Sequence, residues 1–304
     1  MQAVEASKEG PRVTELQATQ PQTKLGPLVD TALTVQFLSR VVPLLPKGHA
    51  LADRANAALD KALGKLHGAQ MKDGEWGKGG WANALQGSLG AVALESAAAA
   101  GKPIPVGALD NARKAQQDRV ADSGAVDASG AAGVELYAMA GAGRNAAAQS
   151  YEALRLVNEG KSAGKVAPEA DVSEESLRAA GAPATSAPAL AKAFRVTSAQ
   201  SARLDDARML EGFGNNGGEE FLSYMMTSES LVIRGGDEWP KWRAKLEGLL
   251  QKVQSADGSW TGHHCITSPV FCTAAVVQAF TADHDLAILR ARPNAKAGGA
   301  PAGR

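Results

Sequence analysis

The chain has 304 residues, and its 32 Lys and Arg balance its 32 Asp and Glu, so the formal net charge is zero. Proteins that bind DNA or RNA normally carry a basic excess that attracts the phosphate backbone, and this balance therefore argues against nucleic-acid binding. No apolar run approaches the roughly 20 residues that span a bilayer, and the first residues contain no signal-peptide core. We expect a soluble, cytoplasmic protein with no transmembrane segment.

Alanine supplies 60 residues, whereas aromatic residues make up only 5%. Because alanine is the best helix former and clusters of β-branched residues are sparse, the composition predicts an all-α protein. Residues 1–26 are polar without periodic apolar positions, and residues 286–304 end in a run of Ala, Gly and Pro. We expect these ends to be disordered tails on either side of a folded domain over residues 27–285.

Amphipathic helices alternate with more uniformly apolar ones along residues 27–285. The first amphipathic helix begins near Ala50, and its apolar stripe consists of Leu51, Ala55, Leu59, Leu63 and Leu66. A later one carries Trp242, Leu246, Leu249, Leu250 and Val253. The segments Ser88–Ala99 and Val270–Phe280 are small or apolar nearly all round, which is typical of helices buried on every side. Residues 161–188 are dominated by Ser, Gly, Pro and Ala, and we interpret them as a low-complexity insertion or a degenerate repeat.

A repeated turn is the strongest pattern in the sequence. The spacing Q-x-x-D-G-x-W occurs twice, as Gln70, Asp73, Gly74, Trp76 and as Gln254, Asp257, Gly258, Trp260. Trp76 and Trp260 lie 184 residues apart, or four steps of 46, which predicts further turns near residues 122, 168 and 214. Each unit then holds two helices, and about five or six such hairpins would close an α/α toroid.

With these two turns the sequence resembles the terpene cyclase and protein prenyltransferase superfamily, whose helical repeats carry a Gln…Gly-x-Trp signature. The resemblance covers about residues 50–285 and implies an α/α toroid with a central cavity lined by inner helices. The Asp-x-Asp-Asp acid of squalene-type cyclases does not occur here. Val270 stands where the zinc-binding Asp of the prenyltransferases precedes their Cys, which corresponds to Cys272. The resemblance therefore implies a binding or assembly module with a protein partner. The alternative is a zinc-thiolate enzyme acting on an isoprenoid or other lipid.

Two of the five histidines and both cysteines lie in the segment from Thr261 to Cys272. Imidazole and thiolate are good zinc donors, so one interpretation is a zinc site formed by His263, His264, Cys265 and Cys272. A second is a Cys265–Cys272 disulfide, which would indicate an extracytoplasmic location. A third is a nucleophilic Cys paired with His264. A purely structural role for all four residues is the remaining alternative.

Polar side chains also follow the expected turn near residue 214. If the helix from Gly217 is an inner helix, then Tyr224, Ser228 and Glu229 place polar groups in the ring interior, where they could bind a polar ligand; Glu219 and Glu220 lie at its start. Carboxylates in such a place act as acid and base in toroidal carbohydrate-active enzymes, a further alternative function. In a structural interpretation, Glu219 and Glu220 simply favour the positive end of the helix dipole. The candidate catalytic residues are accordingly Cys272, His264, Glu229 and Tyr224.

Overall fold

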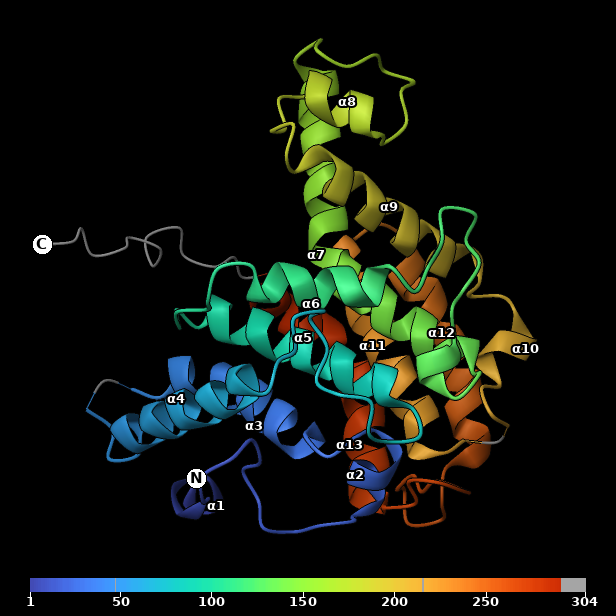
Figure 1. The fold of residues 1–304 in the computed structure, drawn as a ribbon. Coiled ribbons are helices and arrows are strands. Elements are labelled where there is room, and N and C mark those ends of the chain that lie inside the picture. The colour runs from blue at the N-terminus through green and yellow to red at the C-terminus, as the bar shows by residue number, and fades with distance from the viewer. Residues whose placement is uncertain (47, 215, 291–304) are drawn as a thin grey trace, which may run out of the picture. The chain divides into compact units, whose positions relative to one another are not determined.

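In a computed structural model, described here for residues 1–46, 48–214 and 216–290, all regular secondary structure is helical, and this confirms the all-α prediction (Figure 1). A single bridge between Val120 and Val126 is the only extended pairing in these residues. Contacts group the chain into two compact units where we expected one domain. Unit 1 comprises Met1–Ala115 and, among the described residues of the C-terminal end, 287–290, and unit 2 comprises Gln116–Leu286. None of the helices in the described ranges is long and apolar enough to cross a membrane.

Unit 1 is built around helix α3, which packs against α4 and α5. Helix α4 buries one stripe, as its amphipathic pattern predicts, whereas nearly every residue of α5 is buried, as its uniformly small and apolar sequence predicts. The helices of this unit are α1 (Gln2–Ala6), α2 (Gln20–Lys24), α3 (Val29–Val41), η1 (Val42–Leu44), α4 (Ala52–Gly68) and α5 (Asn83–Ala99), and α6 (Ala108–Gln117) leads into unit 2.

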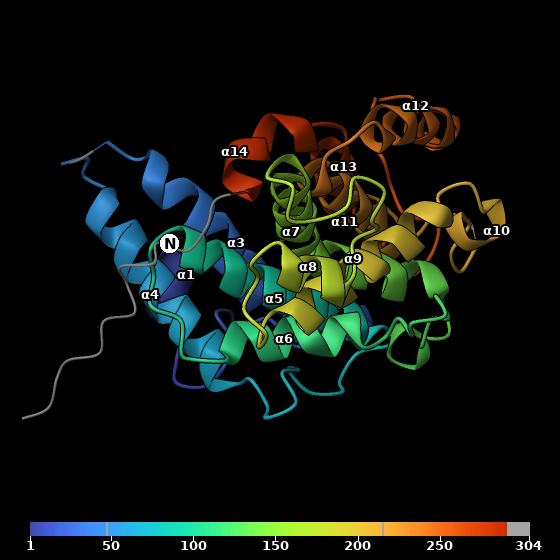
Figure 2. The same cartoon turned by 90° about the horizontal axis from the view of Figure 1, so that it is seen from above.

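Unit 2 is built around helix α11, which lies between α7 and α13 and also contacts α12 (Figures 1 and 2). Every residue of α11 from Gly218 to Ile233 is buried, so this helix forms the centre of the unit. The longer elements are α7 (Glu135–Ser162), α9 (Ala187–Ala202), α11 (Gly218–Arg234), α12 (Glu238–Leu250) and α13 (Pro269–Phe280). The shorter ones are η2 (Ser129–Ala131), α8 (Glu174–Ala179), α10 (Ala207–Leu210), η3 (Gln251–Val253), η4 (Ala282–Asp285) and α14 (Leu286–Leu289).

The N-terminal segment, predicted to be disordered over residues 1–26, is ordered in the structure. It contains α1 and α2, and Thr19 and Gln22 form a capping box at the start of α2. The prediction was wrong because the buried anchors of this segment are isolated apolar residues without the periodic spacing that sequence patterns reveal; they are Val4, Val13 and Leu25. Of the predicted C-terminal tail, Leu286–Leu289 is helical, and residues 291–304 lie outside the described residues.

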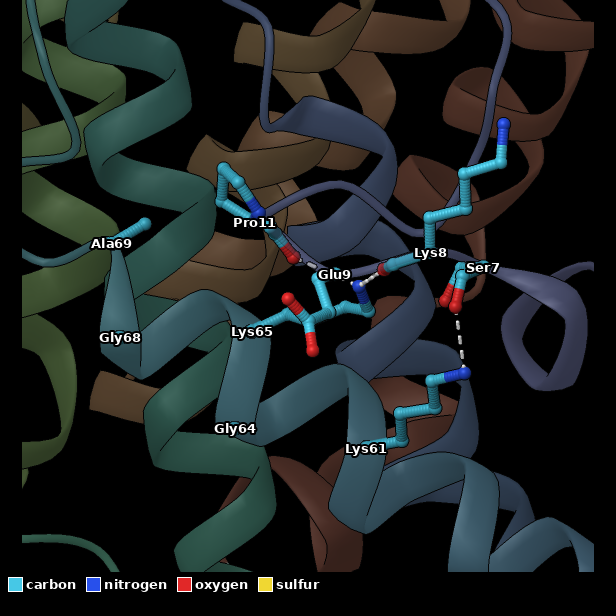
Figure 3. Close-up of a pocket in the computed structure, with 10 residues that line it drawn as sticks. Ser7, Lys8, Glu9, Pro11, Lys61, Gly64, Lys65, Gly68 and Ala69 are labelled. Atoms are coloured by element: carbon cyan, nitrogen blue, oxygen red, sulfur yellow. Dashed lines mark hydrogen bonds between the residues drawn. The ribbon is translucent and has the colours of Figure 1, made fainter.

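Two lysines of α4 hold the N-terminal segment against that helix. Lys61 Nζ donates hydrogen bonds to the carbonyl oxygens of Glu5 (2.9 Å) and Ser7 (2.8 Å). Lys65 Nζ donates to the carbonyl oxygen of Gly10 at 2.8 Å and to that of Lys8. Figure 3 shows both lysine side chains reaching from α4 to this segment beside a cavity of about 630 Å³. Backbone carbonyls thus anchor a segment that has few apolar side chains.

Residues 161–188 form the tip of a helical hairpin in which α7 and α9 pack along each other. A capping box at Ser173 and Ser176 starts α8, which lies at the end where α7 turns back into α9 (Figure 1). The tip has a small apolar core of its own, made by Ala153, Val157, Val166, Leu177, Ala182, Ala187, Leu190 and Ala191. This low-complexity segment is therefore folded, because small side chains suffice where two helices approach closely.

Candidate functional site

The two Gln–Trp turns have the same structure. In the first, the indole Nε1 of Trp76 donates to the carbonyl oxygen of Leu66 at 2.8 Å. In the second, Nε1 of Trp260 donates to the carbonyl oxygen of Leu250 at 3.0 Å. Each bond reaches back ten residues to the end of the preceding helix, so the tryptophan fastens the turn to the helix before it.

The remaining turn residues also repeat their hydrogen bonds. The carboxylates of Asp73 and Asp257 each accept from the backbone N–H two residues later, both at 3.0 Å. The glycine that follows has a left-handed φ of +89° in Gly74 and +83° in Gly258, which explains why both turns use Asp-Gly. The amides of Gln70 and Gln254 donate to the carbonyl oxygens of those glycines, at 3.2 and 2.8 Å.

A third turn of this kind lies at residues 121–125, next to the predicted position near 122. Ala121 N–H donates to the carbonyl oxygen of Ala125 and Gly124 N–H to that of Ala121, both at 2.9 Å. The corresponding bonds of the first turn, from Met71 to Glu75 and from Gly74 to Met71, are 2.8 and 3.0 Å long. Gly124 also has a left-handed φ, +82°. Val126 occupies the position of the tryptophan in this turn. The spacing of the sequence repeat therefore predicted that a turn lies here, but not which residue corresponds to the tryptophan.

The first turn is docked, whereas the second is open. Besides its bond within the turn, Gln70 Nε2 donates to the carbonyl oxygen of Ala108 in the first turn of α6, at 2.9 Å. A Cβ on Gly74 would lie 2.4 Å from the carbonyl oxygen of Asn111, so this face of the turn abuts α6 directly. Gln254 is exposed, and nothing lies within 4 Å of the corresponding position on Gly258.

The start of α11 holds a buried carboxylate with three protein donors. Oε1 of Glu220 accepts from the hydroxyl of Tyr137 at 2.6 Å and from the backbone N–H of Phe213 at 2.9 Å. Its Oε2 accepts from the backbone N–H of Gly217 at 2.8 Å. Glu220 has no exposed surface. Burial and the neighbouring Glu220 carboxylate raise the pKa of Tyr137, so its phenol stays protonated and donates.

Three polar side chains converge on Gly217. A Cβ built on this residue would lie 2.9 Å from Oε2 of Glu220, 3.0 Å from Oε2 of Glu219 and 3.0 Å from Cε1 of His264. Only glycine leaves room for these groups, because none of them lies at the free end of a mobile surface chain. The buried Glu219 also accepts from the backbone N–H of Ile266, at 3.4 Å. The site therefore connects the start of α11 with residues 261–268. We call these residues the His-Cys loop.

The His-Cys loop is tied to the turn before α11. The ring Nε2 of His264 lies 2.7 Å from the carbonyl oxygen of Gly214, and its ring meets that of Phe213 edge-on at a centroid distance of 5.4 Å. His263 is exposed, and its backbone N–H donates to the carbonyl oxygen of Asn216 at 2.9 Å. Cys265 has a left-handed φ of +58°, which is uncommon for a residue with a side chain. The two predicted histidines thus have different environments.

The cysteines do not form the arrangements that the sequence left open. Neither Cys265 nor Cys272 is part of a disulfide in the described chain. Burial, with a further contribution from Glu219, raises the pKa of Cys272 to about 11, so this sulfur is a neutral thiol at pH 7. Nucleophilic attack requires the thiolate. Across the described residues, no group of three His, Cys, Asp or Glu side chains is placed to hold a metal ion, and this includes the predicted zinc set His263, His264, Cys265 and Cys272.

The other two catalytic candidates, Tyr224 and Glu229, point into the protein interior. The hydroxyl of Tyr224 donates to the carbonyl oxygen of Leu210 at 2.6 Å, and burial raises its pKa. Oε2 of Glu229 lies 2.5 Å from Nε of Arg144, and both side chains are almost completely buried. The preceding residue of α11, Ser228, accepts from the indole N–H of Trp242 at 2.9 Å. These polar groups therefore join α11 to α7, α10 and α12.

Sequence reasoning missed Tyr137 and Arg144, the two residues of α7 that complete these contacts. Both lie in a segment of small residues, Leu136–Ala148, whose composition suggests only a buried helix. Arg144 was nevertheless detectable, because an arginine is almost never fully buried unless it is paired. Its partner was not detectable, since Glu229 lies 85 residues later in the chain.

No protein-family model matches this chain, and neither a curated protein nor a solved structure was found to be similar to it. The relation to the terpene cyclase and prenyltransferase superfamily therefore stays a resemblance carried by the two turns. The closure of the helices into a toroid likewise remains an expectation that rests on this resemblance.

Proposed function

We propose that this chain is a non-catalytic binding or assembly module, built from helical hairpins of the toroid type found in prenyltransferases and terpene cyclases. The observation that carries the proposal is that both carboxylate oxygens of Glu220 are engaged within the protein, where they accept three hydrogen bonds from Tyr137, Phe213 and Gly217. The shared hydrogen bonds of the Gln70 and Gln254 turns support the hairpin-repeat part of the proposal.

A catalytic carboxylate or phenol must exchange a proton or a bond with a substrate. Along α11 these capacities are used by the protein itself: Glu229 pairs with Arg144, and Tyr224 donates to the carbonyl oxygen of Leu210. Removing one partner from a buried polar group costs about 1–3 kcal/mol, and more for a charged group. The network therefore supports a structural role, in which it holds the His-Cys loop on α11.

The recognition surface in this proposal lies above that network. Phe213 is 57% exposed and its ring contacts that of His264, and His263 and Thr261 are exposed on the His-Cys loop. Aromatic side chains that are exposed on a rigid support are typical of protein interfaces. The partner is accordingly a protein rather than a nucleic acid. The unbridged cysteines suit a reducing compartment such as the cytoplasm.

Native mass spectrometry of the purified chain, combined with turnover assays on prenyl diphosphates and glycosides, tests this proposal. We expect a mass without zinc or retained lipid, two reduced cysteines and no turnover. One zinc per chain that disappears in Cys272→Ser would instead establish the zinc-thiolate enzyme. The matched control is Thr261→Ala, which removes the Thr261–Thr267 hydrogen bond of the same loop but no member of the zinc set, and so separates metal loss from a general loss of the loop.

A second candidate function, a carbohydrate-active enzyme, is favoured by the convergence of Glu219, Glu220 and His264 around Gly217. Two nearby carboxyl groups of unequal environment are the usual acid and base of glycoside hydrolysis. In this case the His-Cys loop must open, because both carboxylates lack exposed surface. Turnover of a glycoside that is lost in Glu220→Gln and retained in Glu211→Gln, a nearby exposed carboxylate, would favour the enzyme over the binding module.

A further inference from the structure

One side of helix α4 carries three cations that all bind residues 5–10, which we call the covering segment. Arg54, Lys61 and Lys65 follow the i, i+7, i+11 spacing, which places them on one face of the helix. The guanidinium of Arg54 donates two hydrogen bonds, of 3.0 and 2.8 Å, to the carboxylate of Glu5. We call Arg54, Lys61 and Lys65 the α4 basic face.

The covering segment neutralises only one of these three cations. Lys61 and Lys65 donate to four backbone carbonyl oxygens, which carry no net charge. Among the residues that the structure describes, Glu5 is the only carboxylate paired with this face. Asp60 of the same helix pairs with Lys102 instead, at 2.6 Å. The two lysines therefore bind neutral acceptors where carboxylates would bind more strongly, because charge-assisted hydrogen bonds are about twice as strong as neutral ones.

A cavity of about 630 Å³ lies between the covering segment and α4, beside these lysines (Figure 3). Gly64 and Gly68 of α4 line it, and nothing lies within 4 Å of a Cβ built on either residue. Its charged lining residues are three lysines and one carboxylate, namely Lys8, Lys61, Lys65 and Glu9. This side of α4 is thus incompletely filled, and its surroundings favour negative charge.

The covering segment is suited to release. Among its residues Ser7 alone is buried. The side chains of the Arg54–Glu5 pair are 49% and 39% exposed, and ion pairs in such places contribute little to stability. The α4 basic face is therefore the main support of the covering segment, so a stronger ligand for this face displaces it.

We propose that the α4 basic face and its cavity bind an acidic peptide segment of a protein partner, with the covering segment as an internal competitor. The covering segment indicates the kind of occupant, because it is itself a stretch of polypeptide bound through carbonyl oxygens and one carboxylate. A peptide with several carboxylates replaces the carbonyls by charged acceptors. The inference rests on the binding role proposed above and adds the chemistry of a partner, but it involves neither Phe213 nor the His-Cys loop.

Fluorescence anisotropy with a labelled hexaglutamate peptide measures this binding on the full chain, and a hexaglutamine peptide is the neutral probe. We expect only hexaglutamate to bind. Lys61→Gln and Lys65→Gln should each weaken its binding about fivefold, because either change removes a charged contact from the peptide but only a neutral one from the covering segment. The matched control is Lys78→Gln, at an exposed lysine of unit 1 that does not line the cavity, which should bind like the wild type.

Glu5→Gln tests the internal competition. It weakens the hold of the covering segment on Arg54 and leaves the α4 basic face intact, so hexaglutamate should bind about two- to fivefold more tightly. The matched control is Glu169→Gln, at an exposed carboxylate in the hairpin tip of unit 2, which changes the net charge equally. Its affinity for hexaglutamate should equal that of the wild type.

Trypsin provides a second readout of displacement. Lys65 binds the carbonyl group of Lys8, at which trypsin cuts the chain, so saturating hexaglutamate should accelerate that cut. A chain that does not bind hexaglutamate, or that binds hexaglutamine equally well, overturns the inference. So does an affinity that Lys61→Gln and Lys65→Gln leave unchanged, or a cut after Lys8 that the peptide does not accelerate. None of these outcomes affects the zinc and turnover tests of the proposed function.

Discussion

Nε of Arg144 and Oε2 of Glu229 lie 2.5 Å apart in the interior of unit 2, where the two side chains are 1% and 5% exposed. The pair joins the middle of α7 to the C-terminal half of α11. Burial of two charges is favourable only when they form a pair, so the Arg144–Glu229 ion pair favours one alignment of α7 and α11 over shifted alignments.

Removal of one partner from this pair should be far more costly than loss of a surface ion pair. We expect Arg144→Met to lower the free energy of unfolding by about 3–5 kcal/mol, because it leaves a buried carboxylate without its cation. The double variant Arg144→Met with Glu229→Gln should recover part of that loss. Urea unfolding followed by circular dichroism measures both.

The control for this pair is Lys241→Ala. Lys241 lies 2.8 Å from Asp237, with both side chains more than 70% exposed. Exposed pairs contribute about 0–1 kcal/mol, so this variant should unfold like the wild type. An Arg144→Met variant as stable as Lys241→Ala would show that the buried pair contributes nothing to stability.

Gly217→Ala should destabilise unit 2 although its backbone conformation suits any residue. An alanine Cβ would come within about 3 Å of Glu219, Glu220 and His264, and overpacking of this kind costs about 1–3 kcal/mol. Gly248→Ala in α12 is the matched control, since nothing lies within 4 Å of the added Cβ. Alanine at that helical position should raise stability by about 0.5–1 kcal/mol. Thermal unfolding of the two variants should therefore shift in opposite directions.

Trp76 and Trp260 should contribute differently to the free energy of unfolding, although each makes the same kind of hydrogen bond. Trp76→Phe removes the indole donor from the carbonyl oxygen of Leu66 in a buried place and leaves it the backbone N–H of Ala69 at 3.2 Å, whereas Trp260 is only half-buried. We expect a loss of about 0.5–1.5 kcal/mol for Trp76→Phe, the usual net contribution of one hydrogen bond, and less for Trp260→Phe, where water can replace the indole. Chemical unfolding of both variants compares the losses. Equal losses would contradict the difference in burial.

The Cys272 thiol should react only at high pH. Because burial raises its pKa to about 11, iodoacetamide should alkylate it slowly at pH 8 and faster as the pH approaches 11. The measurement uses a Cys265→Ser background and mass spectrometry of the labelled chain. A fast reaction at pH 7 would indicate a thiolate and would revive the nucleophile hypothesis.

The raised pKa of Cys272 also determines the direction in which the stability of the fold changes with pH. The folded chain holds the Cys272 proton more tightly than the unfolded chain does. This contribution to stability is therefore complete below the usual cysteine pKa and declines as the pH rises toward 11. Relative to the wild type, Cys272→Ala should lose less stability between pH 8 and pH 11. An identical decline in both proteins would contradict the assignment.

Local patterns predicted much of this fold, and long-range pairings did not follow from them. The motifs Gln70–Trp76 and Gln254–Trp260 predicted the positions of two turns. The hydrogen bonds within these turns correspond to each other, because seven adjacent residues determine such a turn. Val270 is 79% exposed, although its helix was predicted to be buried on every side. Its exposure could not be predicted from its helix, since composition says nothing about whether a neighbour is present. The same holds for the partnership of Arg144 with Glu229.

In the candidate site, too, local features were predictable from the sequence and long-range contacts were not. Its residues at the start of α11 were identified from the sequence, but their role depended on Tyr137 and on backbone groups of Phe213 and Gly217 that no side-chain pattern encodes. The N-terminal segment was misjudged for a related reason, because Lys61 and Lys65 bind its carbonyl oxygens rather than its side chains.

The Gln70 and Gln254 turns also show that this seven-residue unit is complete before it docks. Gln70 makes its bond within the turn and then a second one to the first turn of α6, while Gln254 makes the internal bond alone. Docking is thus an addition to a preformed connector. The open face at Gln254 and Gly258 is therefore the place where an added helix would dock in the way that α6 docks on the Gln70 turn.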